Sequence, residues 1–304
     1  MIIGIHPVHD SFVHAVPGRK SAKSQALSIS LIFAMLFILM LCCGCAKAGD
    51  GLTDPSPAEE ADSYGAEYSV MDVYGFAKDA LERDRRVLIL FLDGFGYWSF
   101  EAALARGDVP NLATLEAHRA AAVMPTITPV NYAAMVTGRP PEENGVTDRS
   151  GHTVDCDTIF DYALSLGKTA VVIEGDVQIL RFSVPQELNP DFDGDGDTDN
   201  EVFDCALSMM DRGYDLMLVH FHGIDDTGHQ TGPDSAETRE KIRQVDAYAG
   251  LLMEKWDGYV IAVADHGQHE NDGNGDEAYA DKRGIHGSDA ESDVIIPLLV
   301  QVTG

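Results

Sequence analysis

The sequence predicts an α/β fold built on a mostly parallel sheet. Several apolar runs are too continuous for strands with one face in solvent, and they suit strands buried on both faces. Amphipathic stretches with helical spacing lie between these runs, and such alternation is typical of layered α/β proteins. With 304 residues, the chain is long enough for one large domain or two small ones.

The N-terminal residues predict a targeting segment that is not part of this fold. Residues 19–23 are basic, residues 26–41 form an uncharged apolar run, and Gly44 then precedes Cys45. This order is that of a secretory signal. It resembles a bacterial lipoprotein signal with Cys45 as the lipidated residue, although Cys42 replaces the usual leucine. A plain membrane-anchor helix is the alternative, but the run is short for a full span.

We therefore divide the chain into a signal peptide (residues 1–45), a flexible acidic linker (46–66) and one folded domain (67–304). The linker is rich in Gly, Pro, Ser and acidic residues and has too little apolar content to pack. We expect the domain to be exported and tethered by the N-terminal lipid to the outer face of a bacterial cytoplasmic membrane, or otherwise to lie outside the cytoplasm. Cys156 and Cys205 either pair there or remain free buried thiols.

Within the domain, five apolar runs are the predicted strands and five amphipathic stretches the predicted helices. The strands cover residues 87–92, 169–174, 215–221, 259–264 and 294–302. The helices cover residues 111–118, 131–137, 158–166, 201–212 and 234–255.

Three acidic residues lie at the carboxyl ends of these strands. Asp93 and Asp265 directly follow the first and fourth strands, and Asp225 comes four residues after the third. Ligand sites of open α/β sheets form at this edge. A scatter of purely structural acids would not favour one end, so we expect the three carboxylates to share a site. Taken alone, however, Asp93 also fits a turn or a helix N-cap.

Histidines accompany two of these acids. Asp225 and His229, in GIDDTGHQTGP, are four residues apart and can face one ion, or they lie in a solvated loop. The glycines of this segment favour a shaped loop over a regular helix, and spacing alone does not favour Asp225 over Asp226. Asp265 and His266 are adjacent, so both reach one ion only if the chain turns at the following glycine.

His286 in IHGSD fits a ligand and a buried structural histidine equally well. Thr128 precedes Pro129 and a predicted helix that begins at Asn131, which makes it a candidate N-cap. The same place suits a nucleophile, because N–H groups at a helix N-terminus favour an oxyanion and a bound metal lowers a hydroxyl pKa. From one turn away, the Asn131 amide can donate to a phosphoryl oxygen.

In their order, these segments resemble the alkaline phosphatase superfamily, most closely its type I phosphodiesterase/nucleotide pyrophosphatase branch. The matching motifs are Asp93-Gly94, Thr128 through Gly138, Asp225 through Pro233, Asp265-His266-Gly267 and His286-Gly287. The resemblance covers about residues 87–302. It implies an alkaline-phosphatase-like three-layer α/β/α sandwich around a mostly parallel central sheet, with residues 67–304 as the catalytic domain.

The resemblance also implies two divalent metals, with zinc preferred over manganese or iron. One metal would be held by Asp93, Thr128, Asp265 and His266, and the other by Asp225, His229 and His286. Thr128 would attack a small phosphate-ester substrate, and water would release the resulting phospho-threonine. A phosphomonoesterase or phosphonate hydrolase is the alternative on this scaffold. A sulfatase fits less well because its Cys/Ser-x-Pro-x-Arg signature is missing around Thr128, and a non-catalytic metal-binding surface lipoprotein would need no nucleophile.

Two features depart from that family. The nucleophile segment reads Thr-Pro-Val-Asn from Thr128 to Asn131, where the family usually has Thr-Phe-Pro-Asn. The segment between His266 and His286 is short and acidic, where related phosphodiesterases commonly carry a long capping insertion. We therefore expect an open site with loose selection of the leaving group.

An acidic segment, residues 190–201, resembles a calcium-binding loop, with Gly196 at the sixth loop position. The position of the expected final acid holds Val202, so a solvated acidic turn is the alternative to a structural calcium site. The candidate calcium ligands are Asp191, Asp193, Asp195 and Asp197.

The net charge of −29 disfavours nucleic acid as a docked partner. It does not exclude a small phosphate ester, because a locally positive metal centre can lie inside an acidic protein.

Overall fold

A computed structural model describes residues 64–273 and 280–302. The expected signal peptide, Cys45 and most of the expected linker lie outside these residues. At the start of the described range, Tyr64 and Ala66 pack against the buried cluster of Ala121, Val294 and Ile295. In the described ranges no helix has the length and apolarity needed to cross a membrane. Cys156 and Cys205 are free thiols.

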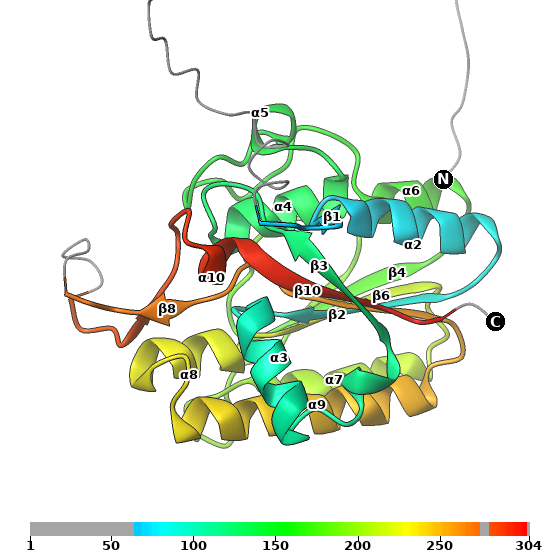
Figure 1. Ribbon diagram of the computed structural model, residues 1–304. Helices are drawn as coiled ribbons and strands as arrows, with labels where there is room; N and C mark the ends of the chain where they lie inside the picture. The colour runs from blue at the N-terminus through cyan, green and yellow to red at the C-terminus, as the bar shows by residue number, and fades with distance from the viewer. Residues whose placement is uncertain (1–63, 274–279, 303–304) are drawn as a thin grey trace, which may run out of the picture. The chain divides into compact units, whose positions relative to one another are not determined.

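The domain is an α/β/α sandwich around an eight-stranded sheet, as predicted (Figure 1). The strand order is β1-β3-β10-β7-β2-β6-β4-β5. Every pairing is parallel except those of β10 with β3 and β7. The strands are β1 (Tyr68–Ser69), β2 (Val87–Leu92), β3 (Glu116–Ala121), β4 (Ala170–Glu174), β5 (Gln186–Leu188), β6 (Leu216–Phe221), β7 (Tyr259–Val263) and β10 (Ile295–Val300).

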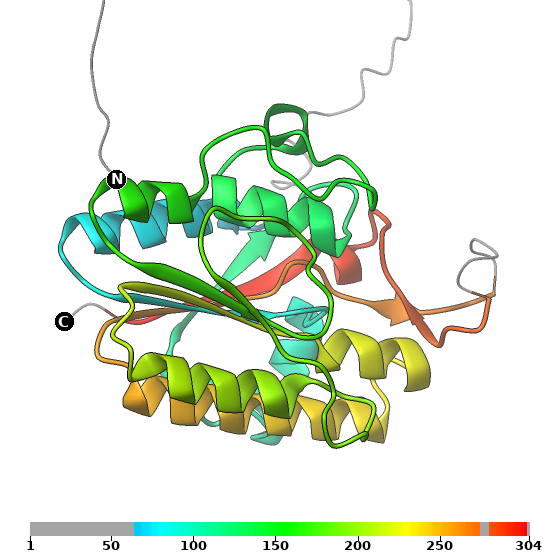
Figure 2. The ribbon, with the colours of Figure 1, turned by 180° about the vertical axis from the view of Figure 1, so that it is seen from behind.

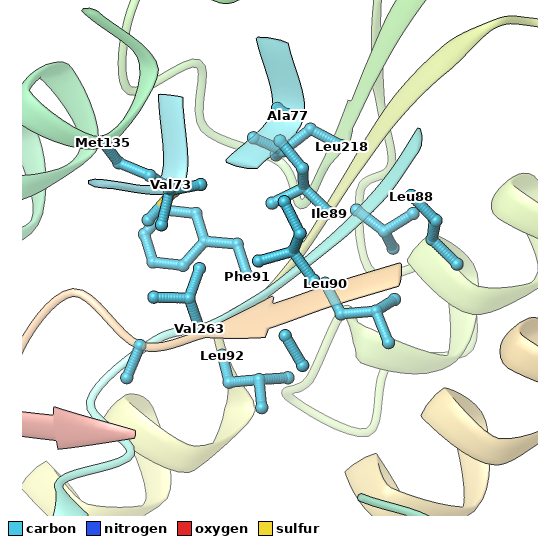
Figure 3. Close-up of a cluster of buried hydrophobic side chains, with 14 of the residues drawn as sticks. Val73, Ala77, Leu88, Ile89, Leu90, Phe91, Leu92, Met135, Leu218 and Val263 are labelled. Atoms are coloured by element: carbon cyan, nitrogen blue, oxygen red, sulfur yellow. The ribbon is translucent and has the colours of Figure 1, made fainter. Parts of the chain in front are cut away.

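Strand β2 lies at the centre of the described core, between β6 and β7. All six of its residues are buried. Figure 3 shows why its sequence is continuously apolar: Val73, Ala77 and Met135 from the helices pack close to the β2 side chains, with Leu218 and Val263 from the neighbouring strands. A strand covered on both faces has no position where a polar side chain would reach water.

Helices cover both faces of the sheet (Figures 1 and 2). One face carries α2 (Asp72–Glu82), α4 (Thr128–Thr137) and α6 (Ile159–Ser165), and the other carries α3 (Tyr97–Arg106), α7 (Asp199–Met210), α8 (Gly223–Thr231) and α9 (Ala236–Lys255). The shorter elements are α5 (Pro141–Asn144), α10 (Glu291–Val294), the 3-10 turn η1 (Leu112–Thr114) and a two-stranded sheet of β8 (His269–Glu270) and β9 (Gly284–Ile285).

Three sequence-based expectations about elements are wrong. Residues 111–118 are not a helix: they form η1 and the first part of β3, which pairs with β10. Helices α2 and α3 were not predicted at all. The glycine-rich segment after β6 is the regular helix α8 and not a shaped loop. In α8 the glycine at 228 leaves room for a neighbour, since a Cβ there would lie 1.9 Å from Gln268 Oε1.

Candidate metal centre

The carboxyl ends of three adjacent strands form the floor of the site. Asp93 directly follows β2, and Asp225 lies in the first turn of α8, just after β6. Asp265 follows the end of β7 after one intervening residue, Ala264. The turn after β2 depends on Gly94, which has φ of +71° and approaches α8 so closely that a Cβ would lie 2.7 Å from Asp225 Oδ1. A residue with a side chain would be strained there and would displace a candidate ligand.

The first predicted ligand set converges on His266 Nε2. This atom lies 3.2 Å from Asp265 Oδ2, 3.3 Å from Thr128 Oγ1 and 3.5 Å from Asp93 Oδ1. All four side chains are buried. Asp93 Oδ1 and Asp265 Oδ2 have no hydrogen-bond partner among the described residues. Burying two carboxylate oxygens without hydrogen bonds costs free energy unless a cation compensates their charge. The donor set therefore fits a divalent ion.

The second predicted set is formed by Asp225, His229 and His286. Helix α8 brings the first two onto one face, with 3.1 Å between Asp225 Oδ2 and His229 Nε2. His286 Nε2 lies 3.8 Å from Asp225 Oδ1. The His286 ring also stacks on the ring of His266, with centroids 3.7 Å apart, so the two sets are neighbours. All seven predicted residues therefore lie together.

Each of the three histidines is oriented by a backbone carbonyl. The Nδ1 atoms of His229, His266 and His286 lie 2.7, 3.1 and 2.8 Å from the carbonyl oxygens of Gly284, Gly267 and Thr126. A ring that donates its Nδ1–H in this way presents an unprotonated Nε2 on the other side. All three Nε2 atoms face the carboxylates, which is the usual arrangement of histidine ligands around a metal.

Charge crowding also indicates a cation site. Burial raises the pKa of Asp265 well above its usual value, and the nearby charge of Asp93 adds to this. Burial acts on Asp93 in the same direction, but hydrogen bonds from His220 and His222 outweigh it and hold the Asp93 pKa well below its usual value. Burial lowers the pKa of His286 to about 3, with His266 as the next cause. A divalent ion would offset the repulsion among these acids.

Thr128 is the first residue of α4, and it does not act as the cap. Ile127 is the N-cap residue, and no side chain caps the helix. The Thr128 hydroxyl lies at the helix N-terminus beside His266 Nε2, and Thr128 is 8% exposed. Its position at a helix N-terminus beside a histidine therefore gives the hydroxyl the polar environment expected for a nucleophile.

Asn131 has a different environment from the one expected of a substrate-binding amide. It is fully buried. Its Oδ1 accepts from the Val123 N–H at 2.7 Å, and its Nδ2 lies 3.0 and 3.2 Å from the carbonyls of Val123 and Pro125. The predicted donation to a phosphoryl oxygen is therefore wrong for this conformation. Asn131 instead holds the loop that leads to Thr128.

Two groups at the site were missed. The first is the pair His220 and His222, which contact Oδ2 of Asp93. The second is the Gln268 amide, which donates to both the side chain and the carbonyl of Asp225. The two histidines had a signal in the sequence. They alternate in HFHGID at the end of a strand, so they project from one face beside Asp93.

The predicted calcium loop is only partly assembled. Asp191, Asp193 and Asp195 form an exposed group whose carboxylate oxygens lie within reach of one ion. Asp197 is not in this group, because its carboxylate pairs with Lys241 and accepts from the Thr198 N–H. At the seventh position of such loops the ligand is the backbone carbonyl, so the Asp197 side chain is free to turn away.

Comparison with known proteins gives one family. The sequence profile described as type I phosphodiesterase / nucleotide pyrophosphatase matches residues 87–158 and 168–295. GPI ethanolamine phosphate transferase 3 of Schizosaccharomyces pombe is 26% identical over 184 residues, which cover 56% of this chain and 18% of that protein. Mouse ectonucleotide pyrophosphatase/phosphodiesterase family member 7 is 24% identical over 226 residues, which cover 62% and 51%. The chain thus spans about half or less of these relatives.

A solved structure supports the fold independently. Murine ectonucleotide pyrophosphatase / phosphodiesterase 5, in an inactive variant complexed with AMP, aligns with a TM-score of 0.55 at 14% identity. The alignment covers 71% of this chain and 88% of that one. At this identity the likeness shows the fold.

Proposed function

Because the chain belongs to the type I phosphodiesterase / nucleotide pyrophosphatase family, we propose that it hydrolyses phosphate esters at a two-metal site through a phospho-threonine intermediate on Thr128. The observation that carries this proposal is the convergence of three buried carboxylates, three Nε2 atoms and one hydroxyl in two adjacent groups. A structural metal site would not require the hydroxyl.

The proposed ligands are Asp93, Asp265, His266 and Thr128 for one ion, and Asp225, His229 and His286 for the other. Zinc suits this mixture of imidazole and carboxylate donors. Two bound ions would stabilise charge on the attacking and leaving oxygens and favour the deprotonated hydroxyl.

The chain's own groups account for the rest of the reaction. Thr128 Oγ1 loses its proton to solvent and forms a bond to phosphorus while the bond to the leaving oxygen breaks. The N-terminus of α4 favours negative charge at this place. Water then attacks the phospho-threonine, the bond to Oγ1 breaks, and the hydroxyl is restored.

We propose a small phosphodiester as the substrate, with loose selection of the leaving group. Between His266 and His286 the described residues form only the small β8–β9 sheet, so the described part of this segment is too small to act as a long cap over the site. A phosphomonoesterase or phosphonate hydrolase is the alternative on the same scaffold. A second reaction, transfer to an alcohol, is supported by the relatives named ethanolamine phosphate transferases. An alcohol would then replace water in the second step.

The test uses the full chain, loaded with zinc, on bis-p-nitrophenyl phosphate, p-nitrophenyl phosphate and p-nitrophenyl sulfate. We expect turnover of the phosphate esters and none of the sulfate. Thr128→Ala should abolish turnover and retain both zinc ions, because three ligands of the first site remain, whereas Thr128→Ser should retain activity. Unchanged turnover in Thr128→Ala would rule out the threonine mechanism. Formation of a phosphate ester with added ethanolamine would favour transfer.

Two further parts of the proposal concern location and calcium. We propose that the enzyme is exported and anchored through lipidated Cys45, which lies outside the described residues. Cys45→Ala should then move it from the membrane fraction to the soluble fraction, and an unchanged distribution would exclude the anchor. We also propose a structural calcium ion at Asp191, Asp193 and Asp195. Calorimetric titration with Ca²⁺ should detect one site that Asp193→Asn weakens.

A further inference from the structure

The oxygen of Asp93 that faces away from the first ligand set is held by two histidines. His220 Nε2 lies 3.0 Å from Asp93 Oδ2, and His222 Nδ1 lies 3.3 Å from the same atom. The other oxygen, Oδ1, faces His266 and has no hydrogen-bond partner among the described residues. The two oxygens of one carboxylate therefore have separate surroundings.

The His220 ring is fixed inside the core. It is fully buried and stacks on Phe91, with centroids 3.7 Å apart and planes at 5°. The His222 ring lies against it at 3.7 Å, and Tyr132 of α4 meets it edge-on at 5.5 Å. Rotation of the ring would require several buried aromatic groups to move together, because such a core has little free volume. Its orientation is thus set by the packing.

A second buried carboxylate lies behind this ring. Glu174, at the end of β4, is fully buried, and its Oε2 lies 3.7 Å from His220 Nδ1. Its Oε1 accepts from Gln186 Nε2 at 3.0 Å, which fixes the carboxylate. The row Glu174–His220–Asp93 therefore extends from the interior of β4 to the metal centre. Packing alone does not explain why these polar groups are buried together. Apolar side chains in their places would avoid the free-energy cost of removing two carboxylates from water.

We propose that His220, assisted by His222, is a positioning residue that orients Asp93 for the ion shared with Asp265 and His266. Donation from both rings to Oδ2 keeps the carboxylate from rotating and directs Oδ1 at the ion. Partners that orient a ligand commonly change metal affinity by about 10–100-fold when they are removed. The inference rests on the proposed two-metal site and assigns a role to two residues that the site itself does not require.

Two substitutions separate hydrogen bonding from packing. His220→Phe keeps an aromatic ring for the stack on Phe91 and removes the donor. His220→Gln loses the ring that stacks on Phe91 but places an amide N–H near the position that Nε2 has in wild type. We would measure zinc content by elemental analysis, and the affinity of each ion by competition with a chromophoric chelator. Thermal unfolding of the metal-free proteins would report folding.

We expect His220→Phe to weaken one of the two zinc ions by about 10–100-fold and to leave the other unchanged. His220→Gln should restore most of the affinity. If His220→Phe does not fold, His222→Leu serves in its place, because this side chain is partly exposed. It removes the second donor and should weaken the same ion by a smaller factor.

The contrary outcomes are distinct. If the wild-type chain binds no zinc, the proposed function itself is wrong. If wild type binds two ions and His220→Phe binds them equally well, only the positioning role is wrong. If His220→Phe does not fold and His222→Leu binds both ions as tightly as wild type, the positioning role is also wrong. If wild type binds three ions and His220→Phe two, His220 is a ligand of a third ion together with Asp93 and His222, which also overturns the positioning role.

Discussion

At the scale of single residues, the site consists of candidate metal ligands and of the groups that hold them. Gln268 donates to Asp225, as His220 does to Asp93, and backbone carbonyls hold the three histidines. The ligands were predictable because each lies in a short motif whose residue types suit metal chemistry. Gln268 was not predictable, because a buried glutamine looks the same in sequence whether it contacts a candidate ligand or packs elsewhere. His220 and His222 could have been found from their alternation at the end of a strand.

The first prediction concerns Asn131. Asn131→Ala removes a buried amide and leaves both the N–H and the carbonyl of Val123 without their partner. We expect it to lower the free energy of unfolding by about 2–4 kcal/mol, measured by urea denaturation. Turnover per folded molecule should also fall, because the loop before Thr128 loses its anchor.

Asn144→Ala is the matched control. Asn144 is equally buried and bonds to Arg139 and Val146, outside the metal centre. It should cost a similar free energy of unfolding and leave turnover per folded molecule unchanged. Loss of turnover in Asn131→Ala without any loss of stability would contradict the structural role and restore the substrate-binding role expected from the sequence.

At the scale of elements, the strands buried on both faces and four of the five amphipathic helices were predicted correctly. Residues 111–118 and the glycine-containing segment after β6 were not. The β2 and β7 runs, and β6 apart from His220, are apolar because helices cover them on both sides. Residues 111–118 carry a helical spacing of apolar side chains, but they form the short turn η1 and the start of β3, which pairs with β10. Long-range pairing of this kind overrides local propensity, and no local pattern records it.

The second prediction tests whether glycine in α8 is required by contact. Substituting Gly228 by Ala should stabilise a helix by about 1 kcal/mol from propensity alone. Here the new Cβ would overlap Gln268 Oε1. The Gln268 side chain cannot move away freely, because its amide donates to the carbonyl and to Oδ1 of Asp225 and would lose these hydrogen bonds. We expect net destabilisation of the metal-free protein by chemical denaturation, and weaker zinc binding at the Asp225 site.

Gly75→Ala in α2 provides the comparison. Nothing lies within 4 Å of a Cβ at this exposed helical position. It should therefore stabilise the protein by about 0.5–1 kcal/mol. If Gly228→Ala were stabilising to the same degree, the close approach of α8 to Gln268 would not constrain the site.

At the scale of the whole molecule, negative charge is distributed unevenly between surface and interior. Among the described residues most acidic side chains are exposed or partly exposed, where their charge costs little. Asp199 is different because it is fully buried, between α7 and the start of α8. Burial raises the pKa of Asp199 to about 7, with the charge of Asp197 as the next cause. Desolvation of the carboxyl group and then the charge of Asp225 raise the pKa of Asp226 to about 6, although that residue is exposed. These two raised pKa values should make stability depend on pH.

The direction of this dependence can be worked out for Asp199. Its usual pKa is 3.8, so between about pH 4 and 7 the folded chain holds a proton that the unfolded chain has lost. Stability contributed by this group therefore falls as pH rises through that window. Asp199→Asn removes the titration and can keep both backbone hydrogen bonds, since Oδ1 accepts from His222 and Gly223. Relative to that of wild type, the free energy of unfolding of the variant should rise by on the order of 1–3 kcal/mol from pH 5 to pH 8.

Urea unfolding of the metal-free proteins at both pH values measures this difference. The contribution of Asp226 to the pH dependence cancels, because Asp226 is present in both proteins. The exposed Asp204, on the same helix, supplies the control Asp204→Asn, which should show no such gain. The reasoning requires that Asp199 be neutral in the folded protein at pH 5 and that its charge be unfavourable at pH 8. A constant difference between variant and wild type at the two pH values would mean that Lys241 and His222, the opposing groups nearby, compensate the buried charge fully. The interior acids would then contribute nothing to the pH dependence of the fold.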